Sequence, residues 1–383
     1  MTTTINNEHK KLNVPNLRFP EFQGEWEKTK FGDIATVVGG GTPDTNTSQY
    51  WNGKIQWFTP SEIGRNKYVY NSVRTISEEG LNKSSAKLLP IGTILLSSRA
   101  TVGECSINKK ECTTNQGFQS LIPKENISNE FVYYLIQTKR KDLIRKSCGS
   151  TFLEISANEV RKIVVSIPSI KEQDKIAKLL SLLDDRIATQ NKIIDKLQSL
   201  IKGISSRIFT SIQGIEYRMG DIVTITNGNS NVQDAVTQPK DGWYPFFDRS
   251  EDIKYLPTFL FDKEAIIYPG EGTEFMPRYF KGKFALHQRC YAIFDFNEII
   301  NARFLYFYLK TRNSYFVKNA VGSTVPSLRL DTFQKLKVII PSKKIQHSVS
   351  LCLSSMEQKC NAEKKILHKL LKQKQYLLRQ MFI

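Results

Sequence analysis

A long internal repeat constrains this chain more than any other feature. Residues 131–209 align without a gap with residues 304–382, at a constant offset of 173 residues, so that FVYYLIQTKR matches FLYFYLKTRN. Further upstream, FGDIATVVGGG at Phe31 resembles MGDIVTITNGN at Met219, but the offset there is 188 residues. A repeat of this length indicates a duplicated structural unit. Two similar carboxyl-terminal regions behind two divergent regions predict one scaffold that carries two different recognition modules.

Each copy ends in a pattern that is typical of a coiled-coil helix. From Lys171 to Phe209 the chain has no proline and one glycine, Gly203, and Pro168 fits the start of a helix. Apolar residues recur at steps of four and three, which predicts a heptad seam. The first seam is Ile176, Leu180, Leu183, Ile187, Gln190, Ile194 and Leu197, and the second includes Val349, Leu353, Met356, Leu367 and Leu370.

The first seam contains one polar residue, Gln190, and the repeat places Glu363 at the same position of the second seam. A single polar residue in a coiled-coil seam can fix the helix register at a cost in stability. The alternative is that both residues lie at a solvated point. The first hypothesis predicts that Gln190→Leu stabilises the fold but loosens the register.

The order of these segments predicts the architecture. The second divergent region begins near Tyr217, directly after the first helix, so the second helix can pack on the first only by running antiparallel to it. Strand-like and helix-like segments alternate irregularly within the divergent regions, which favours an α+β fold. We predict two pseudo-symmetric globular domains separated by two long antiparallel coiled-coil helices. The expected segments are a loose tail (1–20), a first domain (21–168), a central helix (169–213), a second domain (214–341) and a carboxyl-terminal helix (342–383).

Charge is the strongest signal in the composition. The chain has 55 Lys and Arg against 37 Asp and Glu, a formal net charge of +18, which suits a polyanionic partner such as nucleic acid. The alternatives are a solvated surface and helices whose lysines face other proteins. The sequence has no apolar run that could span a membrane and no signal peptide, so we expect a cytoplasmic protein. The six cysteines form no C-x-x-C pair and only four histidines are present, so we expect reduced thiols and no metal site.

Polar and basic residues in the expected loops are candidate DNA contacts. Arg can pair with guanine and Asn or Gln with adenine, while Lys, Ser and Thr hold phosphates. The candidates of the first domain are Arg65, Lys67, Arg99, Thr101, Asn115, Gln116 and Gln119. Those of the second are Arg249, Arg278, Tyr279, His287, Gln288 and Arg289. The alternative for each residue is an ordinary solvated side chain. The repeated Gly-Ser-Thr triplets at Gly149 and Gly322 either bind phosphate or only turn the chain.

Motifs for chemistry are absent from the sequence. There is no G-x-x-x-x-G-K-[ST] loop for nucleotide hydrolysis and no Asn-Pro-Pro-Tyr or Asp-Pro-Pro-Tyr tetrad of adenine methyltransferases. Nuclease-like Glu-x-Lys spacings at Glu357 and Glu363 lie on the second predicted helix without a companion Asp, so we interpret them as helix surface charge. The sequence predicts a binding protein without a catalytic site.

Three segments carry a resemblance to a known family. They are LRFPEFQGEWEKTKFGDI, GSTFLEISANEVRKIVVSIPS and the run IPSIKEQDKIAKLLSLLDDRIATQNKIIDKLQSLIKGI. Together they resemble the specificity subunit of a type I restriction–modification enzyme over nearly the whole chain. The I-P-x-x-x-E-Q-x-x-I motif is complete in the first copy, whereas Ile345 replaces the glutamate in the second.

The resemblance implies that the chain is non-catalytic and binds no cofactor. Each domain is then a target-recognition domain for one half of a split, asymmetric site in double-stranded DNA, and the helices set the gap. Two modification subunits with S-adenosylmethionine would dock along the helices and methylate adenine. Two restriction subunits with ATP and Mg would complete the endonuclease, and phage-encoded DNA mimics would compete for the basic surface. The alternatives are a free-standing DNA-binding regulator or architectural protein, and an enzyme with an unrecognised site.

Overall fold

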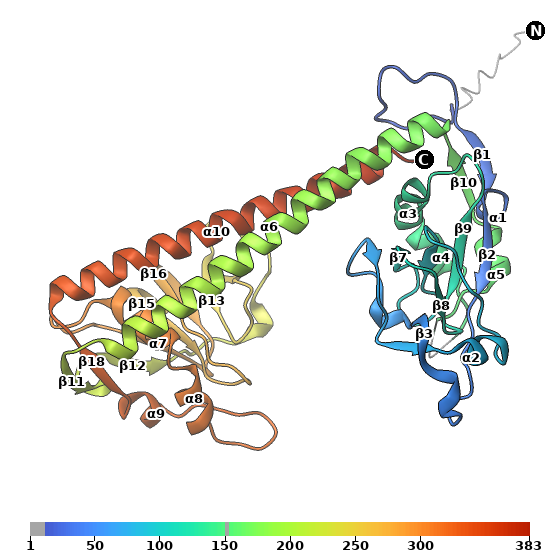
Figure 1. Ribbon diagram of the computed structural model, residues 1–383. Coiled ribbons are helices and arrows are strands. Elements are labelled where there is room, and N and C mark those ends of the chain that lie inside the picture. Colours follow the sequence, from blue (N-terminus) through green and yellow to red (C-terminus); the bar gives the residue numbers. More distant parts are fainter. Residues whose placement is uncertain (1–11, 150–152) are drawn as a thin grey trace, which may run out of the picture. The chain divides into compact units, whose positions relative to one another are not determined.

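The computed structural model describes residues 12–149 and 153–383, which form two compact units. Unit 1 comprises Met1–Thr189 and Leu367–Ile383, and unit 2 comprises Gln190–Ile366. Two long helices, α6 (Ile170–Ser211) and α10 (Lys343–Gln380), each contribute a segment to both units (Figure 1). Their bounds fall within the ranges 169–213 and 342–383 that the heptad pattern predicts.

The described part of unit 1 contains three sheets and five short α-helices. A five-stranded sheet has the order β2-β9-β6-β7-β4, a second has the order β5-β3-β8, and β1 pairs with β10. The strands are β1 (Glu27–Lys30), β2 (Ala35–Gly39), β3 (Trp51–Phe58), β4 (Tyr68–Val69), β5 (Arg74–Ile76), β6 (Ile94–Leu96), β7 (Cys105–Asn108), β8 (Cys112–Thr114), β9 (Gln119–Pro123) and β10 (Val164–Ile167). The helices are α1 (Phe31–Ile34), α2 (Glu78–Asn82), α3 (Asn129–Thr138), α4 (Arg140–Arg145) and α5 (Ala157–Arg161).

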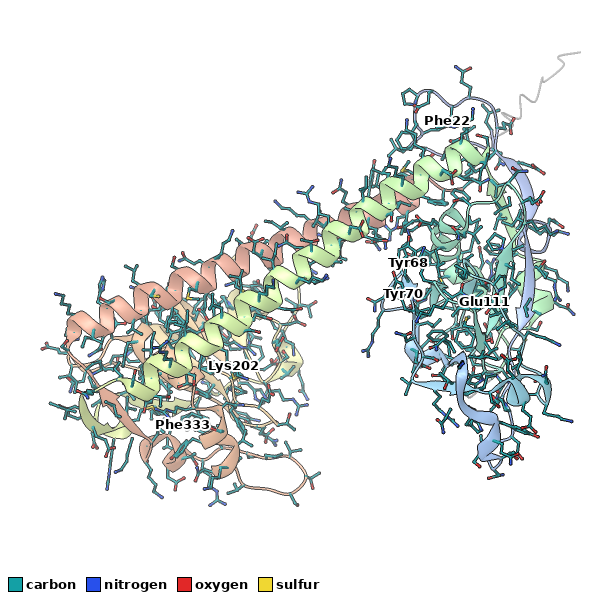
Figure 2. The ribbon with its side chains drawn as sticks, in the orientation of Figure 1. Phe22, Tyr68, Tyr70, Glu111, Lys202 and Phe333 are labelled. Carbon is teal, nitrogen blue, oxygen red and sulfur yellow. The ribbon has the colours of Figure 1, made fainter. Side chains whose placement is uncertain are left out.

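Unit 2 contains one six-stranded sheet, in the order β12-β17-β15-β16-β13-β14, and a separate β11-β18 pair. The strands are β11 (Ile215–Arg218), β12 (Thr224–Asn227), β13 (Tyr244–Phe247), β14 (Lys254–Leu256), β15 (Phe261–Pro269), β16 (Arg278–Leu286), β17 (Cys290–Phe294) and β18 (Lys337–Ile340). The helices are α7 (Ala302–Lys310), α8 (Asn313–Asn319) and α9 (Leu330–Gln334). Figure 2 shows Phe333 of α9 within the body of unit 2, where it is fully buried, and Lys202 on α6.

The repeat of the sequence is also a repeat of the structure. The antiparallel pair β1-β10 has its counterpart in β11-β18, and the pairing of Ile94 with Ile107 recurs as that of Ile266 with Tyr279. The mixed strand and helix content confirms the prediction of an α+β fold with two domains linked by long helices. Two short helices follow the sheet strands in each unit, α3 with α4 in unit 1 and α7 with α8 in unit 2.

In each unit, an aromatic residue at the end of one long helix packs into the core against aromatic residues of the other copy of the repeat. In unit 1, Phe382 stacks on Phe131 with ring centroids 5.2 Å apart. In unit 2, the equivalent of Phe382, Phe209, packs edge-on against Phe304 and Tyr308 at 5.5 Å each. Phe131 and Phe304 are themselves equivalent, so the two copies exchange their helix ends.

The seam positions of α6 and α10 are buried or half-buried between the helices. Within unit 2, Gln190 meets Glu363, while Ile208 and Val349 join the same core, so the two helix segments run antiparallel there. Gln190 Nε2 donates to Glu363 Oε2 at 2.6 Å, and both residues are buried. Hydrogen bonds from Lys359 and Gln190 lower the pKa of Glu363, so its carboxylate is charged at neutral pH. The solvated alternative for this position is therefore wrong.

A glutamine at the start of each long helix fixes the helix to its domain. Gln173 donates to Pro168 O at 2.9 Å and accepts the Ser128 N–H at 3.0 Å. Gln346 makes the same two bonds, to Pro341 O and from the Asn301 N–H. Buried polar groups are stable only when they are paired in this way, and the repeated glutamine satisfies backbone groups at both sites.

The glutamate that differs between the copies has a local role. Glu172 is buried, forms an ion pair with Arg18 at 2.7 Å and accepts the indole N–H of Trp26 at 3.3 Å. Ile345, its counterpart, is exposed and needs no such partner. The Leu17 N–H also donates to Gln380 O. The prediction of a loose tail over 1–20 is therefore wrong for residues 12–20, because the buried carboxylate requires a cation.

In the residues that the structure describes, no helix is long and apolar enough to cross a membrane. Within the same ranges, no group of three or more His, Cys, Asp or Glu side chains could hold a metal ion.

The exchanged aromatic residues yield a paired prediction. Phe382→Ala should destabilise unit 1, and Phe209→Ala unit 2, by about 3 kcal/mol each, because a buried ring is replaced by a cavity. Hydrogen exchange should show the loss of protection in the mutated unit. Tyr376→Ala, at an exposed position of α10, is the control. Equal loss in both units from either variant would contradict the exchange.

The Gln190–Glu363 pair changes the prediction for the coiled coil. Gln190→Leu alone should now cost about 1 kcal/mol, because it removes one donor from a buried carboxylate that keeps Lys359. The double variant Gln190→Leu/Glu363→Leu should be more stable than the parent but lose a unique register. Thermal melts measure the first effect and disulfide trapping between the helices the second. A double variant with one trapped register would contradict the register role.

Candidate nucleic-acid interface

Loops from distant parts of the sequence meet at one site in unit 1. The Ser98 N–H donates to Gly117 O at 2.8 Å, and the Ile155 N–H donates to Ser98 O at 3.0 Å. Gly40 joins the same site, since a side chain there would lie 2.0 Å from Asn115 O. We call this set of loops, comprising residues 40–47, 97–104, 115–117, 148–149 and 153–155, loop cluster 1.

Unit 2 contains a counterpart, loop cluster 2, comprising residues 228–231, 248–253, 270–275, 287–289 and 321–327. The Leu328 N–H donates to Gly270 O at 2.8 Å, as Ile155 does to Ser98 in unit 1. Gly228 is as crowded as Gly40, since a side chain there would lie 2.0 Å from Leu286 O. The two clusters therefore have the same backbone framework.

The framework places different side chains at equivalent positions. Pairing of Ser97 with Phe118 in unit 1 corresponds to pairing of Pro269 with Cys290 in unit 2, an offset of 172 residues. At that offset, Asn115 and Gln116 correspond to His287 and Gln288. One scaffold thus presents two different sets of hydrogen-bonding groups.

Several candidates of unit 1 lie in loop cluster 1. Arg99 forms a half-exposed ion pair with Glu154 at 2.8 Å, and exposed Thr101 shares a hydrogen bond with Ser97. Asn115 Oδ1 accepts the Gly117 N–H, so its amide N–H groups are not needed for this bond. The remaining candidates of this unit are exposed Gln116, which accepts a hydrogen bond from Thr42, exposed Arg65, and Gln119 on β9. The buried Oε1 of Gln119 has no hydrogen-bond partner among the described residues.

Lys67 is not available to DNA. Its side chain is 8% exposed, and Nζ donates to Glu130 Oε2 at 2.9 Å and to Ser181 Oγ at 3.0 Å. A buried ammonium that is already paired would lose those bonds in order to reach a phosphate. The sequence predicted Lys67 as a DNA contact on a loop, whereas in the structure its side chain bonds to Ser181 of α6.

In unit 2, the turn between β16 and β17 presents His287, Gln288 and Arg289. Burial lowers the pKa of His287, so the imidazole is neutral at pH 7. Its Nδ1 accepts the Arg289 N–H at 3.2 Å, which leaves Nε2–H as a donor. Arg289 pairs with Glu271 at 2.7 Å but is 63% exposed. These groups, with exposed Arg249, can donate hydrogen bonds to base edges or phosphates.

Arg278 and Tyr279 lie on strand β16 and not on a loop. Arg278 Nη2 bonds to Ser250 O, and its buried Nη1 has no protein partner among the described residues. The Tyr279 hydroxyl bonds to Glu264, and the guanidinium of Arg303 lies 3.6 Å from its ring centroid. Burial first, and then Glu264, raises the pKa of Tyr279 to about 12. Tyr279 is therefore half-buried, and its hydroxyl is already bonded within the unit.

Most of the predicted seam residues are buried, whereas Ile187, Leu197, Val349, Met356 and Leu367 are half-buried. Exposed apolar residues lie elsewhere on the helices, at Leu182 (59%), Leu200 (52%) and Leu351 (64%). Leu182 adjoins a groove of about 370 Å³ between α3 and α6, which Glu130, Asp174 and Lys178 also line. Surface for docking is available on these helices, but it does not coincide with the seam.

Sequence reasoning missed the acidic members of the loop clusters, Glu154 and Glu271. Each forms an ion pair with an arginine that the sequence predicted as a DNA contact, Glu154 with Arg99 and Glu271 with Arg289. The repeat contained a signal, since Glu154 and Ser327 are equivalent positions and bridge to Arg99 and Glu271 respectively.

Of the Gly-Ser-Thr triplets, Ser150 and Thr151 lie outside the described residues. Gly322–Thr324 forms the tip of a loop closed by the pairing of Val321 with Ser327.

Comparison with known proteins agrees with this arrangement. The family model of the type I restriction modification DNA specificity domain matches residues 23–199 and 215–372, once for each copy. The MjaIX specificity subunit of a type I restriction enzyme from Methanocaldococcus jannaschii is 30% identical, over 90% of this chain and 89% of that protein. The EcoR124I/EcoR124II specificity subunit from Escherichia coli is 31% identical over 48% of this chain and 47% of its own length.

A solved structure has the same fold. The crystal structure of the S subunit of a type I restriction–modification system from M. genitalium superposes with a TM-score of 0.65 at 17% identity, covering 97% of this chain and 99% of that one. The two matched domains, the duplicated loop clusters and the full-length relative together assign the chain. It belongs to the specificity subunits of type I restriction–modification enzymes, the non-catalytic components of those systems.

Proposed function

We propose that this chain directs DNA methylation and cleavage by reading a bipartite, asymmetric target, one half with each unit. The observation that carries the proposal is the pair of loop clusters, which share a backbone framework but differ in side chains. Arg99, Asn115 and Glu154 stand where the second unit has Glu271, His287 and Ser327, while glutamine is kept at 116 and 288. A duplicated framework with different donors and acceptors suits two different half-sites in one target.

The chemistry of the clusters supports DNA as the ligand. Amide side chains can bond to adenine, whereas arginine and the His287 Nε2–H can donate to guanine acceptors. The net charge of +18 would attract the phosphate backbone and make binding depend on salt. Ion pairs such as Arg99–Glu154 would hold arginines in place before DNA arrives, so that less side-chain entropy is lost on binding.

We further propose that α6 and α10 set the gap between half-sites and dock two modification subunits through their exposed faces. Those subunits would supply S-adenosylmethionine and methylate one adenine in each half-site. Two restriction subunits, using ATP and Mg, would add translocation and cleavage. Linking two weak recognition domains raises the effective concentration of the second once the first has bound. A phage protein that mimics DNA would compete for the same DNA-binding surface.

The first experiment maps methylated adenine across the genome by single-molecule sequencing, in cells with the cognate modification subunit and with or without this chain. We expect two short half-sites separated by a fixed gap, and their methylation should disappear when the chain is deleted. Unchanged methylation, with a demonstrably active modification subunit, would favour the free-standing DNA-binding regulator instead.

Lengthening the helices tests the role in spacing. Because Gln190 meets Glu363, an insertion after Ile187 is matched by one after Lys365. Four residues in each helix add about 6 Å and rotate the two ends relative to each other, so the gap should change or be lost while both half-site sequences are kept. Seven residues in each helix keep the heptad phase and serve as the control for folding. An unchanged gap in both variants would refute the role in spacing.

A further inference from the structure

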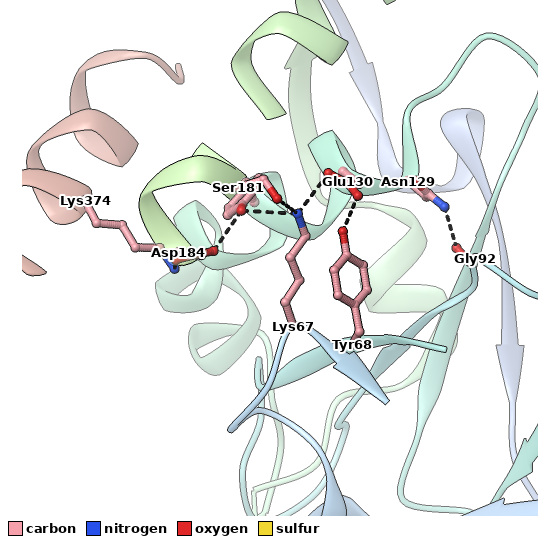
Figure 3. Close-up of polar contacts among 9 residues, drawn as sticks. Lys67, Tyr68, Gly92, Asn129, Glu130, Ser181, Asp184 and Lys374 are labelled. Carbon is pink, nitrogen blue, oxygen red and sulfur yellow. Dashed lines mark hydrogen bonds and ion pairs between the residues drawn. The ribbon is translucent and has the colours of Figure 1, made fainter. Parts of the chain in front are cut away.

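Lys67 is the centre of a polar network inside unit 1. Nζ donates to Glu130 Oε2 at 2.9 Å, Ser181 Oγ at 3.0 Å and Tyr134 OH at 3.3 Å (Figure 3). The ammonium also lies 4.8 Å from the ring centroid of Tyr134 and 5.1 Å from that of Tyr68. A lysine this enclosed is stable only because each of its three protons has an oxygen partner.

The network joins four elements of the unit. The Tyr68 hydroxyl bonds to Glu130, and the Tyr134 hydroxyl donates to Asp184 Oδ2 at 2.7 Å. Lys374 of α10 pairs with the same Asp184 at 2.6 Å. Burial raises the pKa of Glu130, but hydrogen bonds from Tyr68 and Lys67 lower it by more. The net pKa lies below the ordinary value, so the carboxylate is charged. The chain of contacts thus runs from β4 through α3 to α6 and α10, as Figure 3 shows.

The network ties to the helices a segment whose other hydrogen bonds run mainly to strands of the same unit. The Gly64 N–H donates to Ser106 Oγ on β7, Ser106 Oγ donates to Asn66 O, and the Ser72 N–H donates to Gln56 on β3. Strand β4 has only two residues and is the edge of its sheet, where it pairs with β7 alone. The segment before it carries exposed Arg65, a candidate DNA contact, and the segment after it carries exposed Tyr70 and Val73. Figure 2 shows Tyr68 and Tyr70 close together on this edge. Lys67 and Tyr68 therefore anchor segment 59–73 to the helices.

Unit 2 has only part of the network. Glu357 occupies the position equivalent to Asp184 and accepts the Tyr306 hydroxyl at 3.0 Å and the Lys310 ammonium at 2.5 Å. Both donors come from α7. Among the described residues of unit 2, no strand residue hydrogen-bonds to α10 in the way that Lys67, next to β4, bonds to Ser181 of α6. The link from a sheet edge to the long helix is therefore a specific addition of the first unit.

We propose that Lys67 is a positioning residue, which fixes the DNA-facing segment 59–73 on α6 and thereby restricts the gap that the protein accepts between its two half-sites. The proposal rests on the proposed function. Adding one base pair moves a half-site by about 3.4 Å along the DNA and rotates it by about 35°. A segment held by three hydrogen bonds to fixed helices resists that displacement, whereas a loosened segment follows it.

The experiment measures methylation of duplexes whose gap is the mapped length, one base pair shorter or one base pair longer, with the cognate modification subunits present. The variants are Lys67→Met, and Lys67→Met/Glu130→Gln, which avoids an unpaired buried carboxylate. We expect methylation of the wrong gaps, relative to the mapped gap, to rise about tenfold, the ratio that 1.4 kcal/mol produces. The preferred half-site bases should stay the same. Lys335→Met, which breaks an exposed ion pair on α9, is the matched control and should keep the parental gap profile.

The outcomes separate this inference from the proposed function. If the parent protein shows no gapped target, the proposed function fails. If the parent selects one gap and both Lys67 variants keep the same selectivity, the positioning role is refuted while the proposed function stands. A merely destabilised variant would lose methylation at all gaps together, without a change in their ratio. Spin labels on Asn71→Cys and Arg186→Cys, with the native exposed Cys148 and Cys352 replaced, give a second measurement. Their distance distribution should broaden in Lys67→Met, and an unchanged distribution would also refute the role.

Discussion

The structure depends on the burial of each helix end in the core associated with the other copy of the repeat. Phe382 completes a core around Phe131 and Trp26, and Phe209 completes one around Phe304 and Tyr308. Because neither helix end buries its ring against its own copy, neither copy is complete without the other. This exchange lets α6 and α10 pack along their seams and gives both domains the same attachment.

Polar contacts at the helix starts refine that attachment. Gln173 and Gln346 use the same two bonds to bind a proline carbonyl and a domain N–H, and the two glutamines of the repeat are therefore under the same physical constraint. Glu172 adds Arg18 and Trp26 only in unit 1, where residues 12–20 pass over the helix. Such buried groups add little to net stability. Their main effect is to select one arrangement of helix and domain, because other arrangements leave a charge or an amide unpaired.

The loop clusters combine one backbone framework with different side chains, which suits the recognition role that we propose for them. Crowded glycines, Gly40 and Gly228, and paired backbone groups hold the loops in equivalent conformations. The side chains at their tips differ, and several are already held by acidic neighbours. Recognition can then change by substitution at the tips without disturbing the domain attachment, which depends on α3, α7 and the long helices.

The sequence alone determined the repeat, the helix ranges, the α+β class and the family, because heptad spacing and repeated motifs depend on local order along the chain. It also predicted DNA contacts at Asn115, Gln116, His287 and Gln288, which folding places in the two loop clusters. It misplaced Lys67 and Tyr279, and treated Arg99 and Arg289 as free cations. Their partners, Glu130, Glu264, Glu154 and Glu271, are brought to them only by folding. Which charges remain available to DNA was decided by tertiary structure, since burial and pairing depend on contacts between residues far apart in the chain.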